Sequence, residues 1–399
     1  MTFKKNKKID LVILAGGKGS RIKSHLKGHP KPMLKFNSKP FIQYLINHYS
    51  KYNLNRIIIL CGFRHKSIFV KYDGKFFNFI KIICLKEKKP MDTGGALYQL
   101  KKLKVKNFFL INGDSILTQN PYRLVNSLKR NSIGSMTIIK NRNYQSNKLS
   151  KLSIKNNIPF FSKKGKFINA GVYYFSSKLF KYIKNQKISL ENAILSSLII
   201  KKKINAYISN QFFIDIGSKK NLKIAPKKLC YNFLKPAAFL DRDGVINHDY
   251  GYVNNIKKFK FKVGVVKGLK YLKNKNYNIF VVTNQAGIGK KIFTEKKFFS
   301  LHKKLKDILE KKNIYFDDVQ YSPYHINSKI KKFKKNSNFR KPGNLMIEKI
   351  KNNWDIDLKK SFMIGDKNSD KIAAKKSNVK FYWNSKNFHS QVKKIINNY

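Results

Sequence analysis

An apolar run in the second half of the chain ends at two aspartates, Asp241 and Asp243, which are separated by one residue. The run Ala237–Leu240 predicts a strand, and because side chains alternate along a strand, both carboxylates point the same way. Two such close carboxylates repel unless a cation lies between them or one is protonated. Mg²⁺ suits oxygen ligands of this kind. One carboxylate could then attack phosphorus while the other protonates the leaving oxygen.

Later segments supply the other groups that phosphate chemistry needs. A hydrophobic run ends at Thr283 and Asn284, whose hydroxyl and amide suit a phosphate. Arg340 and Lys341 add cations, and another hydrophobic run ends at the carboxylate of Asp366. An aspartate pair alone is also common in turns and helix caps, so the order of the four segments carries the prediction.

In this order the four segments resemble the motifs of the haloacid dehalogenase (HAD) phosphatases. The resemblance implies that Asp241 is the nucleophile that becomes aspartyl-phosphate and that Asp243 is the general acid and base. It further implies that Thr283 and Lys341 bind the phosphoryl group. Asp366 would complete a Mg²⁺ site with Asp241 and Asp243.

A finer resemblance is to the heptose-bisphosphate 7-phosphatases and their relatives, the histidinol phosphatases. It rests on the stretches 241–253 and 283–295. Only short insertions separate the motifs, so no large cap domain is expected, and a small sugar phosphate fits. Asp370, one helical turn after Asp366, is expected to support the site or to be an ordinary acidic residue at a helix N-terminus.

Members of that family often carry a zinc loop with cysteine and histidine ligands. The matching stretches here read Ser322-Pro323-Tyr324-His325 and, later, Ser337-Asn338-Phe339 before Arg340. The cysteines are absent, and one histidine cannot complete a structural zinc site of about four ligands. We therefore expect no zinc and a loop that is held by packing.

A second set of chemical groups lies near the N-terminus. The predicted strand Asp10–Leu14 runs into a loop with three glycines in four positions, where backbone N–H groups can approach a phosphate chain closely. Lys18 and Arg21 could neutralise the charge of such a chain. The spacing is neither that of a Rossmann loop nor that of a Walker loop. The phosphate-binding candidates are Gly16, Gly17, Gly19 and Ser20.

This loop and the residues after it resemble the sugar-1-phosphate nucleotidyltransferases, a family with a GT-A-like mixed sheet. The matching segments are 14–21, 30–34, 39–41, 92–97, 112–114, 169–173 and 213–217. The resemblance implies that Asp114 and Asp215 hold a Mg²⁺ ion that bridges the α-phosphate. It also implies that Arg21 holds the leaving pyrophosphate and that Lys31 lies near the α-phosphate.

The sugar side of this site is implied by the same resemblance. Gly94 and Gly95 belong to the segment on the sugar and base side, Asn169 would contact the sugar, and Lys164 would hold the sugar phosphate. Two positions depart from the family pattern. Lys163 stands where the family has glutamate before Lys164, and the pair Met91-Asp92 stands where many members have Leu-Gly.

Short β-branched runs alternate with amphipathic segments along the whole chain, which predicts an α/β fold of two Rossmann-like domains. A linker is expected at 226–236, because the segment has a proline at each end and no clear periodicity; it would separate the domains 1–225 and 237–399. The expected strands are 10–14, 56–61, 107–111, 170–175, 237–240, 279–283 and 361–364.

Composition bears on partners and location. The net charge is +66, but only eight of the 86 basic residues are arginine, and the charge is spread along the whole chain. Nucleic-acid readers rely heavily on arginine, so we expect no specific nucleic-acid partner. No apolar run is long enough to span a membrane. The three separated cysteines fit a reducing cytoplasm; they are Cys61, Cys84 and Cys230.

Together the two resemblances imply a bifunctional, Mg²⁺-dependent enzyme that makes GDP-heptose for surface polysaccharide. The second domain would remove the 7-phosphate of D-glycero-α-D-manno-heptose 1,7-bisphosphate, and the first would join the product to GMP from GTP. No residue pattern selects guanine over other bases. One alternative is a pair that acts on another sugar phosphate or on histidinol phosphate. A remote alternative is a basic nucleic-acid-binding protein with degenerate sites, against which the intact aspartates argue.

Overall fold

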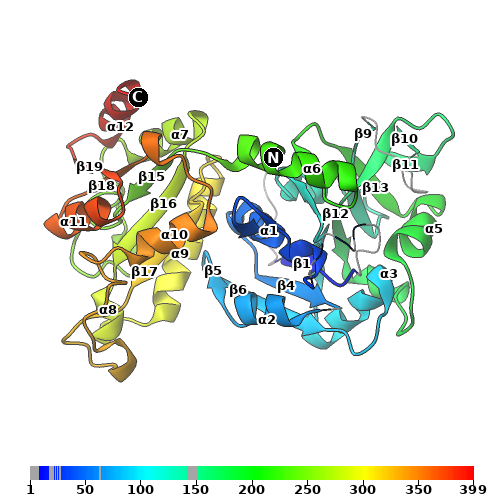
Figure 1. Cartoon of the computed structure of the whole chain (residues 1–399), viewed down its shortest axis with the longest axis horizontal. Helices are drawn as coiled ribbons and strands as arrows, with labels where there is room; N and C mark the ends of the chain where they lie inside the picture. The colour runs from blue at the N-terminus through cyan, green and yellow to red at the C-terminus, as the bar shows by residue number, and fades with distance from the viewer. Residues whose placement is uncertain are drawn as a thin grey trace. The chain divides into compact units, whose positions relative to one another are not determined.

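The chain folds into two compact units, which are described separately (Figure 1). The first unit comprises Met1–Tyr49 and Leu54–Lys228, and the second comprises Ser50–Asn53 and Leu229–Tyr399. The computed structural model describes residues 9–17, 22, 24, 26, 28–62, 64–141 and 151–399.

A mixed sheet organises the first unit, with ten strands among the described residues. Along its main path the order is β11-β10-β12-β7-β1-β4-β6-β5, and β9 pairs with both β12 and β13. The central strands β1, β4 and β7 are parallel and almost wholly apolar, as strands buried on both faces must be. The strands are β1 (Asp10–Leu14), β4 (Arg56–Cys61), β5 (Phe76–Phe77), β6 (Ile80–Lys86), β7 (Asn107–Asn112), β9 (Gly134–Lys140), β10 (Leu152–Lys155), β11 (Ile158–Phe161), β12 (Phe167–Ser176) and β13 (Ile204–Ile208).

Two short antiparallel pairs and a set of helices complete this unit. The pair β8 (Ser115–Leu117) and β14 (Phe213–Asp215) follows the carboxyl end of β7, and β2 (Lys35–Phe36) pairs with β3 (Lys39–Pro40). The helices are α1 (Phe41–Ser50), α2 (Lys66–Tyr72), α3 (Asp92–Ala96), α4 (Tyr122–Asn126), α5 (Ser196–Ile200) and α6 (Lys219–Phe233). Ser50 of α1 and the residues of α6 after Lys228 belong to the second unit. A π-helical stretch, Leu190–Leu195, leads directly into α5.

The helix α6 covers most of the segment that was expected to link the two domains. Residues 226–233 of the expected linker lie inside α6, which contains Pro226 in its interior. The segment 226–236 has no clear apolar periodicity because Leu229 is its one buried side chain.

The second unit is a parallel α/β sheet of five strands in the order β17-β16-β15-β18-β19. This order places β15 at the centre, so the segments that follow β15, β16 and β18 meet at one edge of the sheet, where ligands bind in open parallel sheets. The strands are β15 (Ala237–Leu240), β16 (Asn278–Asn284), β17 (Asp318–Ser322), β18 (Phe362–Gly365) and β19 (Lys380–Trp383). The helices are α7 (Val265–Asn274), α8 (Ala286–Gly289), α9 (Glu295–Glu310), α10 (Leu345–Asn353), α11 (Asn368–Lys376) and α12 (Phe388–Asn397).

The α/β class predicted from the sequence is confirmed in both units. Three expected strands have the observed bounds, namely 10–14, 56–61 and 237–240, and the other four differ by a few residues at their ends. None of the helices in the described part of the chain is both long and apolar enough to cross a membrane.

Candidate active sites

A cleft of about 1520 Å³ opens in the first unit beside the carboxyl ends of β1 and β7. Its lining residues run from Leu14 to Asn221, which lie 207 positions apart in the sequence. The residues of the expected site that line it are Gly16, Gly17, Lys31, Asp114, Asn169 and Asp215. Gly19, Ser20 and Arg21 lie outside the described residues.

Two aspartates are held next to each other in this cleft by strand pairing. Asp114 lies directly before β8 and Asp215 ends β14, and the register of the pair sets Asp215 opposite Ser115. The backbone N–H of Ile216 donates to the carbonyl oxygen of Asp114 at 2.9 Å. Two carboxylates at neighbouring backbone positions are the kind of oxygen donors that a hard divalent cation takes.

Neighbouring groups orient each of these carboxylates. Lys31 Nζ lies 2.8 Å from Asp114 Oδ2 in an ion pair within the cleft. Asp215 accepts from the backbone N–H of Gly217 and from the side-chain amide of Asn221, each at 2.8 Å. Lys31 therefore supplies a positive charge beside the two aspartates, where a phosphate chain would need one.

The glycine loop packs closely against the end of β4. Ala15 N–H donates to the carbonyl of Leu60 at 2.8 Å, and a Cβ on Gly62 would lie only 2.6 Å from the carbonyl oxygen of Gly16. Glu87, just after β6, also lines the cleft, and burial raises its pKa to about 7. Glu87 was not among the residues expected at the site, because no motif in the sequence marks it.

Of the four candidates on the sugar side of the site, Asn169 lines the cleft and the other three do not. Asn169 lines the cleft at a bulge in β12, where its Oδ1 accepts from Gly171 N–H at 3.1 Å and its Nδ2 donates to Tyr173 Oη at 2.6 Å. Gly94 and Gly95 are buried in α3, and among the described residues they are not part of the cleft lining. Lys164 is exposed in the turn after β11 and also lies apart from that lining.

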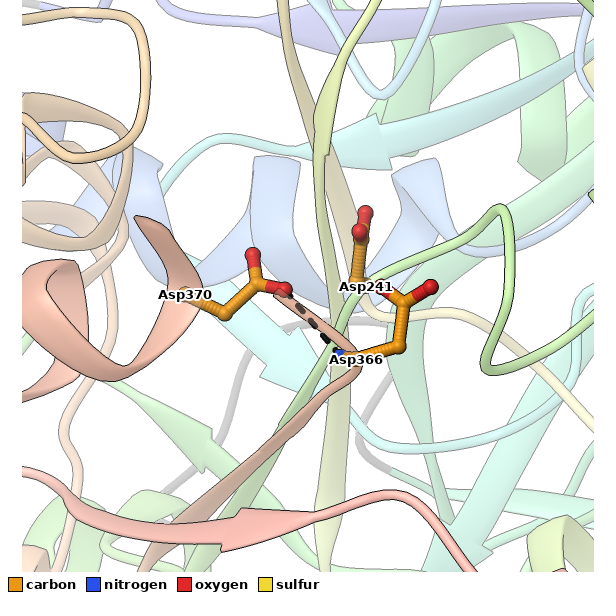
Figure 2. Close-up of side chains that lie close together, drawn as sticks. All are labelled: Asp241, Asp366 and Asp370. Atoms are coloured by element: carbon orange, nitrogen blue, oxygen red, sulfur yellow. Dashed lines mark hydrogen bonds between the residues drawn. The ribbon is translucent and has the colours of Figure 1, made fainter. Parts of the chain in front are cut away.

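In the second unit, three carboxylates converge at the carboxyl edge of the sheet. Asp241 follows β15, Asp366 follows the neighbouring strand β18, and Asp370 lies in the first turn of α11 (Figure 2). One oxygen of each lies within 4.8 Å of the others. Asp366 Oδ1 is buried and has no hydrogen-bond partner among the described residues, as expected of a group that awaits a cation.

A buried lysine joins two of these carboxylates. Lys341, with 3% of its surface exposed, lies 3.0 Å from Asp241 Oδ1 and 2.5 Å from Asp370 Oδ1, and it donates to the carbonyl of Val282 at 2.8 Å. Burial raises the pKa of Asp241 to about 7, although Lys341 pulls it down. Burial alone would lower the pKa of Lys341, but Asp241 and Asp370 raise it above its usual value.

Asp243 lies outside this three-carboxylate group and is held by other side chains. Arg242 Nη2 lies 2.7 Å from its Oδ2, while Asn247 and Gln285 each donate to it at 2.9 Å. Arg242 is 1% exposed, and its guanidinium carbon lies 5.5 Å from the centre of the Phe298 ring. Sequence reasoning missed Arg242, Asn247 and Gln285, although all three lie within the quoted motif segments.

The remaining phosphate-binding candidates have distinct neighbours. Thr283 Oγ1 accepts from the amide of Gln285 at 2.9 Å. Asn284 binds the backbone of Lys341 in both directions, at 3.0 and 3.1 Å, and so holds that lysine in place. Arg340 is partly exposed and donates to the carbonyl of Tyr324 at 3.3 Å.

Aromatic side chains pack against one another in the loop 323–339. The rings of Tyr324 and Phe333 are 5.7 Å apart, and those of Tyr324 and Phe339 are 6.5 Å apart, both nearly perpendicular. The backbone N–H of His325 donates to the carbonyl of Phe333 at 3.1 Å. This packing ties the loop together just before Arg340 and Lys341.

The folds and sites define a nucleotidyltransferase domain followed by a HAD-like phosphatase domain, and comparison with known proteins agrees. Residues 11–230 match the model of the nucleotidyl transferase family, and residues 238–393 match that of the polynucleotide kinase 3 phosphatases. The chain thus belongs to the nucleotidyl transferase family and carries, in addition, a phosphatase domain.

Curated relatives match the phosphatase domain closely. D-glycero-beta-D-manno-heptose-1,7-bisphosphate 7-phosphatase of Rhodopseudomonas palustris is 35% identical over 145 residues, which is 36% of this chain and 81% of that protein. The enzyme of the same name from Salmonella typhi is 40% identical over 144 residues, which is 36% of this chain and 77% of that protein. Among solved structures, HddC from Yersinia pseudotuberculosis is 26% identical, covers 55% of this chain and 99% of its own, and has a TM-score of 0.46.

Proposed function

We propose that the enzyme acts twice on one sugar. Its phosphatase domain removes the 7-phosphate of D-glycero-α-D-manno-heptose 1,7-bisphosphate, and its nucleotidyltransferase domain then joins heptose 1-phosphate to GMP from GTP. The observation that carries the proposal is the presence on one chain of a nucleotidyltransferase cleft and of a phosphatase domain whose relatives are named for the heptose bisphosphate. We place the division between the two activities at 226–236.

In the phosphatase reaction, a carboxylate oxygen of Asp241 attacks the phosphorus of the 7-phosphate. The bond between phosphorus and the C7 oxygen breaks, and Asp243 gives that oxygen its proton. Water then attacks the aspartyl-phosphate, passes a proton to Asp243 and releases inorganic phosphate. Lys341, 3.0 Å from Asp241, offsets the negative charge that gathers there.

In the transferase reaction, an oxygen of heptose 1-phosphate attacks the α-phosphorus of GTP. The bond between the α-phosphorus and the bridging oxygen breaks, and pyrophosphate leaves. Both reactants are anionic, so the cleft must neutralise them and hold them in line. Lys31 supplies one positive charge there, and the glycine loop supplies backbone donors.

Both sites have residues that fit Mg²⁺. Asp241, Asp366 and Asp370 would hold it in the phosphatase domain, since their oxygens converge and Asp366 Oδ1 lacks a hydrogen-bond partner among the described residues. Asp114 and Asp215 would hold it in the transferase cleft. Bound Mg²⁺ would offset phosphate charge in each reaction.

Separate assays of the two half-reactions test this proposal. Phosphate release is measured with the α and β anomers of heptose 1,7-bisphosphate and with histidinol phosphate. We expect the highest kcat/KM with the α anomer, and a preference for the β anomer, for which the curated relatives are named, would contradict that choice. A preference for histidinol phosphate would contradict the heptose assignment. Transfer to heptose 1-phosphate is measured with GTP, ATP, UTP, CTP and dTTP, and the proposal fails for the base if GTP is not the best donor.

A further inference from the structure

We propose that Lys262 and Asn384 are positioning residues of the phosphatase domain. Each donates a hydrogen bond to the carbonyl oxygen of Gly244, and together they hold the turn after Asp243 against the carboxylate of Asp366. The inference rests on the phosphatase reaction proposed above, and it deepens that function by naming residues that keep two of its carboxylates in place. Neither Lys262 nor Asn384 belongs to a motif segment quoted from the sequence.

Two side chains from distant parts of the chain meet at the carbonyl oxygen of Gly244. Lys262 Nζ and Asn384 Nδ2 each lie 2.9 Å from this oxygen. Lys262 lies shortly before α7, and Asn384 directly follows β19, so neither belongs to the turn that contains Gly244. A carbonyl oxygen has two lone pairs. Because both are engaged by donors from outside the turn, the peptide group of Gly244 is held in one orientation.

The turn at Gly244 and the side chain of Asp366 are as close as glycine allows. Gly244 has a φ of +85°, a conformation that residues with side chains rarely adopt. A Cβ on Gly244 would overlap Asp366 Oδ2, so no side chain fits between the turn and this carboxylate. The place of the Asp366 carboxylate therefore depends on how firmly the Gly244 turn is held.

Asn384 connects the segments that carry Asp243 and Asp366. Its side chain donates to the carbonyl of Gly244, which follows Asp243, and its backbone N–H donates to the carbonyl of Gly365 at 2.9 Å. Gly365 ends β18 directly before Asp366. One residue thus bonds both segments, so a shift of either segment must break a hydrogen bond or move Asn384.

The two donors contribute differently to the hold on Gly244. The ammonium of Lys262 is charged, and a charged donor forms a stronger hydrogen bond than a neutral amide does. The amide of Asn384 is neutral, but it belongs to a residue that also bonds the end of β18. Loss of Lys262 should therefore loosen the turn after Asp243, whereas loss of the Asn384 amide should also separate that turn from the Asp366 segment.

Two measurable properties depend on this arrangement. Mg²⁺ accepts little deviation from octahedral geometry, so the carboxylate of Asp366 must keep its place against Gly244 if the ion is to bind tightly. The proposed general acid, Asp243, must keep its place relative to the leaving oxygen. Residues that orient metal ligands without touching the metal typically change metal affinity or activity by about 10- to 100-fold when they are replaced.

The test compares three variants of the full chain with two controls. Asn384→Leu keeps the approximate size of the side chain and removes the amide, and Lys262→Met removes the ammonium. Lys262→Arg keeps a charged donor. The matched controls are Lys386→Met and Lys260→Met, each of which removes an exposed lysine two positions away from one of the proposed residues.

Two measurements are made on each protein. Urea unfolding with and without Mg²⁺ is followed by the fluorescence of the tryptophans, which lie in the second unit. An ion that binds only the folded state raises the unfolding midpoint, so the shift reports Mg²⁺ affinity. Phosphate release at saturating Mg²⁺ gives kcat with heptose 1,7-bisphosphate and with p-nitrophenyl phosphate.

We expect Asn384→Leu to reduce the midpoint shift with Mg²⁺ and to lower kcat by about 10- to 100-fold. Lys262→Met should lower kcat by about 10-fold, and Lys262→Arg should restore most of that loss. Both controls should match the wild type in both measurements. If Asn384→Leu does not fold, the loss in Lys262→Met and its rescue by Lys262→Arg decide the inference.

The outcomes separate this inference from the proposed function. An unchanged kcat and an unchanged Mg²⁺ shift in folded Asn384→Leu and Lys262→Met would overturn the positioning roles and leave the function standing. A midpoint that falls equally with and without Mg²⁺, at wild-type kcat, would mark both residues as structural and would also overturn the inference. Phosphate release from p-nitrophenyl phosphate alone would contradict the heptose substrate, while the same variants would still decide the positioning roles. If the wild type releases phosphate from neither compound, the proposed phosphatase function fails and the positioning roles fail with it.

Discussion

Asp243 is the residue whose surroundings depart most from what its motif suggests. Its carboxylate is held by a fully buried arginine and by two amides, instead of joining the three converging carboxylates. A general acid must hold its proton at one fixed place relative to the leaving oxygen. Arg242 is therefore a positioning residue in our account, because it is the charged group that fixes this carboxylate.

Replacement of Arg242 tests this role. Arg242→Met should lower the kcat of phosphate release by about 100-fold or more, since general acid catalysis contributes about 10²–10⁴-fold. The kcat of Arg242→Lys should lie between those of the wild type and Arg242→Met. Lysine keeps the positive charge but lacks the planar guanidinium that donates two hydrogen bonds to one carboxylate. Loss of a buried ionic partner is also destabilising, so thermal unfolding is followed alongside kinetics. A folded Arg242→Met enzyme with wild-type kcat and pH profile would contradict the role.

A second prediction at the residue scale concerns His302 and the pH dependence of the free energy of unfolding. It is 2% exposed in α9, and burial together with the charges of Arg242 and Lys306 lowers its pKa well below 6.5. Below pH ~6.5 the unfolded chain therefore binds a proton at this position that the folded chain does not. The free energy of unfolding should fall with decreasing pH by up to about 1.4 kcal/mol per pH unit from this group.

Urea unfolding at pH 7.5, 6.5 and 5.5 measures the effect. Both tryptophans, Trp354 and Trp383, lie in the second unit, so their fluorescence reports on that unit. The variant His302→Gln should show a smaller loss of stability between pH 6.5 and 5.5 than the wild type. An identical pH slope in the two proteins would show that His302 is not the group responsible.

At the scale of elements, contacts between aromatic side chains hold the loop 323–342 together. Phe333 is 7% exposed and packs against Tyr324, so Phe333→Ala should destabilise the second unit by about 3 kcal/mol. Ile326, in the same loop, is 61% exposed, and Ile326→Ala should change stability by less than about 0.5 kcal/mol. Tryptophan fluorescence during urea unfolding measures both.

The same experiment with a zinc chelator checks how the loop is held. We expect the unfolding midpoint of the wild type to be the same with and without the chelator. A clear downward shift would show that a metal supports this loop and that aromatic packing does not suffice.

Elements were the most predictable feature of this chain. The strand Ala237–Leu240 has its expected bounds because four consecutive buried apolar residues leave few other solutions. The helix α6 was not foreseen, since its few buried side chains give a weak periodic signal and Pro226 suggests a break. The periodic pattern of apolar residues in a sequence reflects which side chains are buried. An element with few buried side chains therefore shows little pattern and is hard to predict.

Site residues were predictable where a strand end places them. Asp241 and Asp366 follow adjacent parallel strands, and their meeting follows from topology. Lys164 was expected at the cleft from the family resemblance, but it is exposed and is not among the described residues that line the cleft. Glu87 was missed because a carboxylate in a cleft is recognised by tertiary packing and not by its neighbours in sequence.

At the scale of the whole molecule, the two sites should be separable by mutation. Asp241→Asn should abolish phosphate release and leave nucleotidyl transfer from supplied heptose 1-phosphate intact, because it removes the nucleophile alone. Asp114→Asn should do the reverse, because it removes a carboxylate of the transferase cleft. Each variant is its own control, since the untouched activity reports on folding. If either change in a folded protein abolishes both activities, the two-site account is wrong.

The most direct test of the central claim is a single coupled reaction. Purified wild-type enzyme is incubated with Mg²⁺, D-glycero-α-D-manno-heptose 1,7-bisphosphate and one nucleoside triphosphate at a time, and products are identified by mass spectrometry. We expect inorganic phosphate in every reaction and a GDP-heptose mass with GTP. The heptose assignment would be contradicted if no phosphate is released from the bisphosphate, and the guanylyl assignment if the nucleotide sugar forms with another base.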